Sequence, residues 1–255
     1  LDRSSAASDV YKRQILIFLT SLCFTGCRSQ KPIYRVGMDP YFYPVVMHKR
    51  ATMLSGFSLE LLEEIGRIEN VRFVPVQMSW NNLLYGLNKK TYQAALSVLQ
   101  PYIFNEKKYV FSDAYFSIGL ILIVQQNSKI FSLEDLNNKE IIIPRSPDLL
   151  QILEEYPDVF RTFYRSPEDG FNLLIQGKTT GAIIENYIAS GFLQEPYPGK
   201  VTALPPLITN KGMYLVTTSG KDEEIIKLFN SGLEKLKTQG KYDALIKKWN
   251  LDFIQ

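Results

Sequence analysis

The stretch from Trp80 to Ser112 gathers side chains that can recognise a small molecule without covalent chemistry. Trp80 offers an aromatic face, which can hold an apolar or cationic group by burial and by a cation–π attraction of about 0.5–2 kcal/mol. Ser97 offers a hydroxyl group. Asn105 offers a neutral amide, and a hydrogen bond of this kind contributes about 0.5–1.5 kcal/mol. The chemistry available in this stretch is therefore stacking and hydrogen bonding.

Catalytic and metal-binding side chains are scarce in the rest of the chain. The 255 residues contain one histidine, His48, so no Ser/His/Asp set is assembled easily, and no glycine-rich phosphate loop is present. The sequence has no cluster of histidine and cysteine, so we expect no metal site and no cofactor. The net charge of +3, with both signs interspersed, gives no basic surface for nucleic acid. These features favour a binding protein over an enzyme.

Strand and helix patterns alternate along the chain, which predicts an α/β fold that positions this stretch. The first strand is expected at 33–38, and Ser58 is expected to cap the helix that follows. The next strand, at 71–76, contains Pro75, which suits a central position poorly. The apolar face of the helix after Ser58 is expected to consist of Leu59, Leu62 and Ile65.

The elements around the candidate residues follow the same alternation. Ser79 is expected to cap a helix, and 94–99 is apolar apart from Ser97, as a buried parallel strand should be. A second continuous apolar strand is expected at 119–124. The inward face of the helix after Ser79 is expected to consist of Leu83, Leu84 and Leu87. Further strands are expected at 140–143, 181–184 and 213–217, and further helices at 147–155, 167–176 and 241–249. A terminal helix ending near Gly240 has an apolar stripe of Ile225, Ile226, Phe229, Leu233 and Leu236.

The N-terminal residues are expected to lie outside the folded domain. Residues 1–14 include SSAASDVYKRQ, which resembles a translated sequencing adapter, although a positively charged leader is the alternative. Residues 15–27 resemble the end of a bacterial lipoprotein signal peptide, shortened at its N-terminal side, in which Cys27 receives the lipid. Its apolar run of ten residues is too short to span a bilayer, which needs about 20. An ordinary signal peptide cleaved near Gly26 is the alternative, and it would leave Cys27 unmodified.

Three segments within 80–115 carry a resemblance to a known family. They read Trp80-Asn-Asn-Leu-Leu, Tyr92-Gln-Ala-Ala-Leu-Ser-Val-Leu and Phe111-Ser112-Asp-Ala-Tyr115. Their order and spacing resemble the bacterial extracellular solute-binding proteins, family 3, which deliver polar amino acids to ABC importers. The resemblance implies a periplasmic-binding-protein-like fold of type II, with two lobes joined by crossing strands near 119–124 and 208–213. Lobe 1 would comprise 28–121 and 212–255, and lobe 2 would comprise 122–211.

The resemblance also implies which residues of lobe 1 contact a ligand. Asp39 and Phe42 fall on a loop where an aspartate and an aromatic ring touch the ligand, and Trp80 falls on the second stacking aromatic. A core position is the alternative for either aromatic residue. Ser97, Val98 and Gln100 fall where the end of a strand presents backbone and small polar groups to the ligand.

Asn105 falls on the position of an arginine that normally grips the ligand carboxylate. An arginine forms two parallel charge-assisted hydrogen bonds with a carboxylate, which one neutral amide cannot do. In lobe 2, Glu185 falls on the carboxylate that receives the ligand ammonium. Arg145 and Ser146 fall on the loop that cradles the ligand carboxylate. We therefore expect Arg145 to supply the charge that Asn105 lacks; an exposed surface arginine is the alternative.

These implications describe a monomeric, lipid-anchored binding protein of the cell envelope that passes a small polar solute to an ABC permease. An amino acid is the expected ligand, and a cation without a carboxylate or a short peptide is the competitor. The alternative function is that of an enzyme resembling cyclohexadienyl dehydratases, which share the fold. Their substrates carry carboxylates, so the replacement at Asn105 counts against this alternative. A sensor or scaffold domain is a third class.

Overall fold

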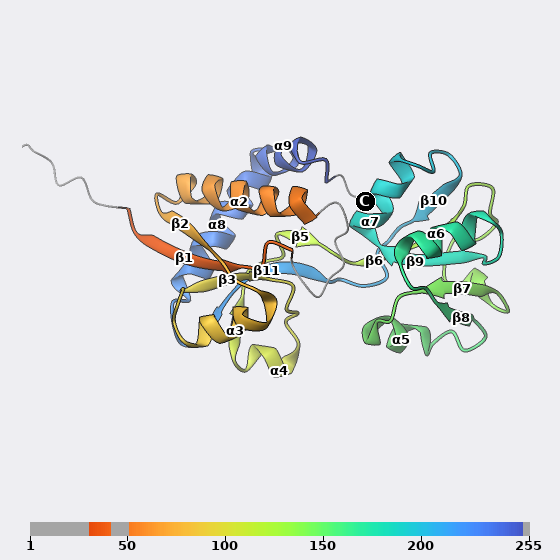
Figure 1. The fold of residues 1–255 in the computed structure, drawn as a ribbon, viewed down its shortest axis with the longest axis horizontal. Coiled ribbons are helices and arrows are strands. Elements are labelled where there is room, and N and C mark those ends of the chain that lie inside the picture. The colour runs from red at the N-terminus through yellow and green to blue at the C-terminus, as the bar shows by residue number, and fades with distance from the viewer. Residues whose placement is uncertain (1–30, 42–50, 252–255) are drawn as a thin grey trace, which may run out of the picture. The chain divides into compact units, whose positions relative to one another are not determined.

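The computed structural model describes residues 31–41 and 51–251 of the chain. Residues 33–255 form one compact unit, and residues 1–32 belong to a separate one. The predicted adapter segment, the signal peptide with Cys27, the candidate Phe42 and the single histidine, His48, lie outside the described residues. The folded part contains two sheets, which we call sheet 1 and sheet 2, with helices packed on them (Figure 1).

Sheet 1 has the strand order β2-β1-β3-β11-β4, with β5 paired to β11. Its strands are β1 (Ile33–Met38), β2 (Arg72–Gln77), β3 (Ala94–Ser97), β4 (Tyr109–Phe111), β5 (Phe116–Ser117) and β11 (Gly212–Thr218). Strand β1 lies parallel to both β2 and β3, whereas β11 runs antiparallel to β3. Every residue of β3 is buried, as its apolar sequence predicts. Strand β2, which contains Pro75, lies at the edge of the sheet, where a missing N–H is tolerated.

Helices cover both faces of sheet 1 (Figure 1). On one face α2 (Ala51–Ile68) packs with α8 (Glu224–Thr238) and α9 (Lys241–Lys248), and on the other lie α3 (Trp80–Asn88) and the short α4 (Ile103–Glu106). The buried side chains of α8 are those of the predicted stripe, which is confirmed. Gly240 follows the end of α8 with a left-handed φ of 68°, which favours glycine at this stop.

The predicted start of α2 is wrong. The helix begins at Ala51, so Ser58 lies within it and does not cap it. The Ser58 hydroxyl donates a hydrogen bond of 2.8 Å to the carbonyl oxygen of Leu54, one turn earlier. This bond gives the hydroxyl of a serine inside a helix a hydrogen-bond partner, so Ser58 does not need a capping position. Leu62 and Ile65 are buried as predicted, but Leu59 is exposed because the helix presents it to solvent.

Sheet 2 has the strand order β10-β6-β9-β7-β8. Its strands are β6 (Leu120–Gln125), β7 (Glu140–Ile143), β8 (Phe160–Phe163), β9 (Gly181–Glu185) and β10 (Val201–Leu204). Strand β7 lies parallel to both of its neighbours, β8 and β9, and β6 runs antiparallel to β9. The helices are α5 (Pro147–Leu153), α6 (Pro167–Ile175) and α7 (Asn186–Gln194), with a 3-10 turn, η2, at Glu134–Leu136. The expected strands and helices of this region are confirmed, and β8, β10 and α7 are additions.

Two further findings concern the part of the chain that the structure describes. No helix there is both long enough and apolar enough to cross a bilayer. Within the same residues, no three histidine, cysteine, aspartate or glutamate side chains are placed so that they could hold a metal ion.

Candidate functional site

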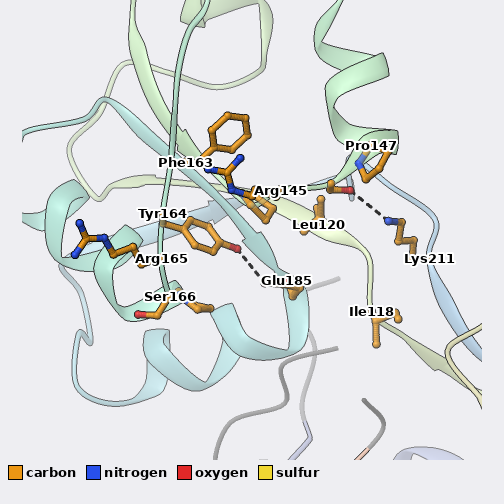
Figure 2. A pocket seen from close by; sticks show the side chains of 13 residues that line it. Ile118, Leu120, Arg145, Pro147, Phe163, Tyr164, Arg165, Ser166, Glu185 and Lys211 are labelled. Atoms are coloured by element: carbon orange, nitrogen blue, oxygen red, sulfur yellow. Dashed lines mark hydrogen bonds between the residues drawn. The ribbon is translucent and has the colours of Figure 1, made fainter. Parts of the chain in front are cut away.

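A pocket of about 870 Å³ opens at one edge of sheet 2 (Figure 2). Its walls are the segments that follow β7 and β8, the start of β6, the end of β9 and the side chain of Lys211. Parallel strands place their carboxyl ends at the same edge of a sheet, and ligands of open α/β sheets bind there. Since β7, β8 and β9 are parallel, the residues after Ile143, after Phe163 and at Glu185 meet in one place.

Glu185 supplies the negative charge of the pocket. It is half-buried at the end of β9, and its Oε2 accepts a hydrogen bond of 3.2 Å from the Tyr164 hydroxyl (Figure 2). Burial, and then the nearby charge of Glu185, raise the pKa of Tyr164 well above its usual value. Tyr164 therefore stays protonated at physiological pH and remains a donor that holds the carboxylate in place. A carboxylate fixed in this way can accept hydrogen bonds from an ammonium group.

Arg145 supplies one of the positive charges. Its guanidinium carbon lies 4.6 Å from the centroid of the Phe163 ring, above the face of that ring (Figure 2). The residue is exposed, so this contact is worth about 0.5–1 kcal/mol and restricts the direction of a long side chain. Arg145 is therefore held on the wall of the pocket while its nitrogen atoms can still donate to an anion.

Ser146 is buried next to Arg145 and faces a second cation. Its Oγ lies 3.3 Å from the Nζ of Lys211, which donates to it. Ser146 is in extended conformation before the first residue of α5, and its side chain makes no capping bond to the helix. Its hydroxyl is thus engaged with Lys211 and directed at the pocket that both residues line.

The carboxylate of Asp39 performs a structural task in sheet 1. Its Oδ2 accepts from the backbone N–H of Trp80 at 2.9 Å, and its Oδ1 accepts from that of Tyr41 at 2.9 Å. Asp39 therefore caps α3 from the end of β1. The residue expected to cap this helix, Ser79, occupies the N-cap position but makes no side-chain capping bond. Trp80 is half-buried and packs against two of the buried apolar clusters of the fold.

Polar side chains near the end of β3 fix the conformation of the chain there. The Oγ of Ser97 accepts from the backbone N–H of Leu99 at 3.0 Å. The amide of Gln100 donates to the carbonyl oxygens of Val98 at 2.6 Å and Gly212 at 2.9 Å. Its Oε1 accepts from the N–H of Gly212 at 3.2 Å. Gln100 thus ties the end of β3 to the start of β11.

Asn105, in α4, is likewise engaged with the segment that follows β3. Its side-chain nitrogen donates to the carbonyl oxygen of Gln100 at 2.8 Å, which closes the loop between β3 and α4. An arginine at this position would bring a charge to the loop, whereas the asparagine amide is used to shape it.

The pocket brings together three of the ten candidate ligand-binding residues, namely Arg145, Ser146 and Glu185. Six others lie in sheet 1, its loops or its helices α3 and α4 and do not line this pocket: Asp39, Trp80, Ser97, Val98, Gln100 and Asn105. Their contacts with a ligand stay predictions, as does that of Phe42. The structure adds Tyr164 and Lys211, which the sequence analysis missed. Tyr164 follows a strand that was not expected, so the sequence offered no signal for it. Lys211 is a cation within the expected crossing segment 208–213, and this position could have identified it as a candidate.

Comparisons with known proteins agree with this fold. Residues 34–252 match the family model described as bacterial extracellular solute-binding proteins, family 3. The chain is 24% identical to a probable histidine-binding protein of Campylobacter jejuni, over 93% of this chain and 97% of the relative. It is also 24% identical to the arginine-binding extracellular protein ArtP of Bacillus subtilis, over 92% of this chain and 96% of that protein. Among solved structures, the unliganded, open L-cystine solute receptor of Neisseria gonorrhoeae matches with a TM-score of 0.71 at 16% identity, over 86% of this chain and 93% of that one.

Proposed function

We propose, from the premise that this chain belongs to the bacterial extracellular solute-binding proteins of family 3, that it captures a free amino acid and delivers it to an ABC permease. Relatives that match nearly the whole chain are named for binding histidine and arginine, which supports an amino-acid ligand. The protein then acts by binding alone and catalyses no reaction.

The single observation that carries the proposal is a pocket whose walls bear opposite charges. Glu185 is held by Tyr164 on one side, and Arg145 lies over Phe163 on another. A zwitterion presents an ammonium and a carboxylate a short distance apart, so it satisfies both walls at once. Charge-assisted hydrogen bonds of this kind contribute about 1.5–3 kcal/mol each. Glu185 receives the ammonium, and Arg145 and Ser146 face the carboxylate.

Capture then works by closure of two lobes, comprising 28–121 with 212–255 and 122–211. Ligand contacts made from both lobes favour the closed state by the amount that the ligand prefers it. In lobe 1 we assign ligand contacts to Phe42 and Trp80 and to the end of β3. Asp39 contributes there by holding the N-terminus of α3 in place.

The same proposal places the protein in the cell envelope as a monomer, anchored by a lipid on Cys27. An acyl chain buried in the bilayer contributes about 0.8 kcal/mol per methylene group, which keeps a binding protein near its permease. The test is the mass of the mature protein from the membrane fraction of a bacterial host, with a Cys27→Ser variant as control. Release of both proteins to the soluble fraction would contradict the anchor.

We expect the purified protein to bind at least one amino acid. Native mass spectrometry should reveal the ligand retained from the cell, and thermal shifts against the common amino acids, polyamines and dipeptides should identify its class. A ligand present at 100 times its Kd stabilises the folded state by about 2.7 kcal/mol, and a chain of this size melts about 2–4 °C higher for each kcal/mol. Failure of every amino acid to raise the melting temperature would overturn the proposal. Turnover of prephenate or arogenate would overturn it in favour of an enzyme.

Replacing Arg145 with alanine is expected to weaken binding of the amino acid about tenfold, because one charge facing its carboxylate is lost. Isothermal titration calorimetry measures the change. Arg145→Lys keeps the charge and should retain most of the affinity, and Arg72→Ala, an exposed change in β2, should have no effect. Undiminished affinity in Arg145→Ala would show that this side chain is only a surface arginine.

A further inference from the structure

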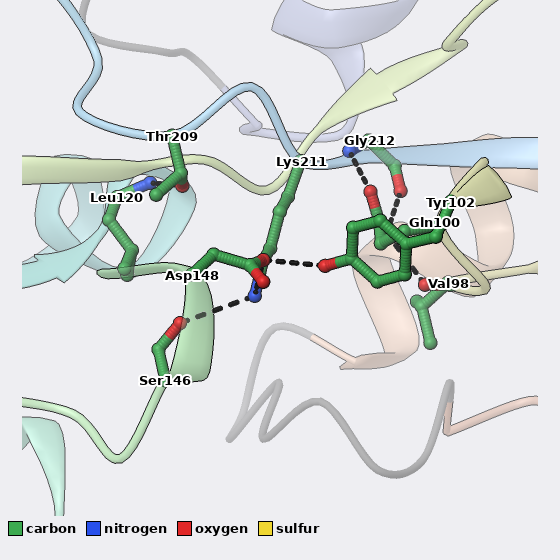
Figure 3. Close-up of polar contacts among 9 residues, drawn as sticks. All are labelled: Val98, Gln100, Tyr102, Leu120, Ser146, Asp148, Thr209, Lys211 and Gly212. Atoms are coloured by element: carbon green, nitrogen blue, oxygen red, sulfur yellow. Dashed lines mark hydrogen bonds and ion pairs between the residues drawn. The ribbon is translucent and has the colours of Figure 1, made fainter. Parts of the chain in front are cut away.

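Lys211 lies where the two sheets are joined, and its backbone is fixed on both sides (Figure 3). Before it, the Oγ1 of Thr209 accepts from the N–H of Leu120 at 3.0 Å. After it, Gly212 makes the two hydrogen bonds to Gln100 described above. The carbonyl oxygen of Lys211 itself accepts from the N–H of Ile118 at 2.9 Å. The side chain therefore starts from a well-defined point and reaches into the pocket.

The ammonium group of Lys211 is shared between two residues at the start of α5. Its Nζ lies 2.7 Å from Oδ2 of Asp148 and 3.3 Å from Oγ of Ser146. The same Oδ2 accepts a hydrogen bond of 2.5 Å from the hydroxyl of Tyr102, which precedes α4 on the side of sheet 1 (Figure 3). Asp148 thus receives one donor from each of two distant segments of the chain.

Asp148 is an anion under all physiological conditions. Partial burial by itself would raise its pKa, but the hydrogen bonds from Lys211 and Tyr102 and the charge of Lys211 outweigh burial and lower the pKa. Burial, the hydrogen bond to Asp148 and its charge raise the pKa of Tyr102 to about 12, so this hydroxyl keeps its proton. The state with Lys211 and Tyr102 donating to an ionised Asp148 is therefore the one present near neutral pH.

We propose that Lys211 binds the carboxylate of the captured amino acid, and that Asp148 is an internal anion which holds Lys211 until the ligand replaces it. This inference rests on the proposed function and names the group that takes the place of the missing arginine. Asn105 cannot serve, because its amide nitrogen is bound to Gln100 and carries no charge. Lys211 carries the charge, lines the pocket and is already next to Ser146.

Lys211 can exchange the carboxylate of Asp148 for that of the ligand because both Lys211 and Asp148 keep a partner after the exchange. A lysine ammonium is a compact charge on a flexible chain of four carbons, so it can turn from Asp148 to the ligand without backbone movement. Asp148 keeps the hydrogen bond from Tyr102 when Lys211 leaves. The side chain of Asp148 is also one-third exposed, at 33%, so water can take the vacated place.

The test compares Lys211→Met with the wild-type protein by calorimetry, using L-histidine, L-arginine and L-glutamine and their decarboxylated amines histamine, agmatine and 4-aminobutanamide. We expect Lys211→Met to weaken binding of the amino acid at least tenfold, whereas the weaker binding of its amine changes less than twofold. Lys211→Arg should restore most of the affinity. Lys129→Met, an exposed lysine outside the pocket, is the control and should bind as the wild type does. Circular dichroism verifies that each variant folds.

A second variant tests the internal anion. Asp148→Asn removes the competing charge and keeps the shape, so the affinity for the amino acid should rise several-fold while that for the amine stays constant. Unchanged or weaker binding of the amino acid would overturn the exchange. The role of Lys211 would be overturned if Lys211→Met bound the amino acid within threefold of the wild type, or if it lost equal affinity for the amine. The proposed function would survive either result. A wild-type protein that binds none of the three amino acids would overturn both this inference and their proposed capture.

Discussion

Replacing Glu185 with glutamine is expected to weaken binding of the amino acid about a hundredfold or more. The glutamine amide has nearly the size of the carboxylate but no charge, so the ligand ammonium would lose its counter-ion in a closed pocket. Loss of one partner from a buried, hydrogen-bonded charge pair costs about 2–5 kcal/mol, and 1.4 kcal/mol corresponds to a factor of ten. The effect should exceed that of Arg145→Ala, because Glu185 is half-buried and held by Tyr164, whereas Arg145 is exposed.

Calorimetry at constant pH and ionic strength provides the measurement, and Glu155→Gln is a matched control because Glu155 is exposed and outside the pocket. Glu185→Asp keeps the charge but shortens the reach by one methylene group, so it should fall between the wild type and Glu185→Gln. An affinity of Glu185→Gln close to that of the control would contradict the assignment of the ammonium to this residue.

The elements that the sequence predicts well are those whose pattern is set by burial. Strands β3, β6 and β9 are apolar along most of their length because both of their faces are covered. A continuous apolar run of this kind can be recognised from the sequence alone. Strands β8 and β10 lie at the edges of sheet 2 and are only partly buried, so their sequences mix polar and apolar residues and were missed. The error at Ser58 has a local cause, because serine occurs both at helix N-caps and inside helices. The residue type alone does not distinguish the two positions.

The residues of the candidate site likewise differ in whether local sequence can predict their positions. Residues at the end of a predictable strand, such as Glu185 in β9, are placed by local sequence, because the strand fixes where its last side chain lies. Tyr102, Asp148 and Lys211 meet although they come from three separate segments, and no local pattern reports such a meeting. Asp39 shows a further limit: the resemblance implies a ligand contact for it, but its carboxylate accepts backbone hydrogen bonds from Tyr41, two residues later, and from Trp80, which only the folded chain brings near.

Replacing Gly119 with alanine is expected to destabilise the fold by about 3 kcal/mol or more, at the point where the two crossing segments touch. A methyl group at Gly119 would lie 2.1 Å from the backbone oxygen of Thr209, which is closer than two such atoms can approach. The neighbouring backbone cannot move aside easily, because Leu120 bonds to the side chain of Thr209 and accepts from the N–H of Ile208 at 2.7 Å. Overpacking costs about 1–3 kcal/mol even where side chains can adjust, and here the obstacle is backbone.

The melting temperature of Gly119→Ala should therefore fall by about 6–12 °C, since each kcal/mol shifts a chain of this size by about 2–4 °C. Gly220→Ala separates crowding from backbone strain, because Gly220 has a φ of 73° and no atom within 4 Å of an added Cβ. That variant should lose only the roughly 1–2 kcal/mol of a left-handed alanine. If Gly119→Ala melts with the wild type, or above Gly220→Ala, the segments around Gly119 and Thr209 are not held in contact, and the proposed closure of the lobes about them loses its physical basis.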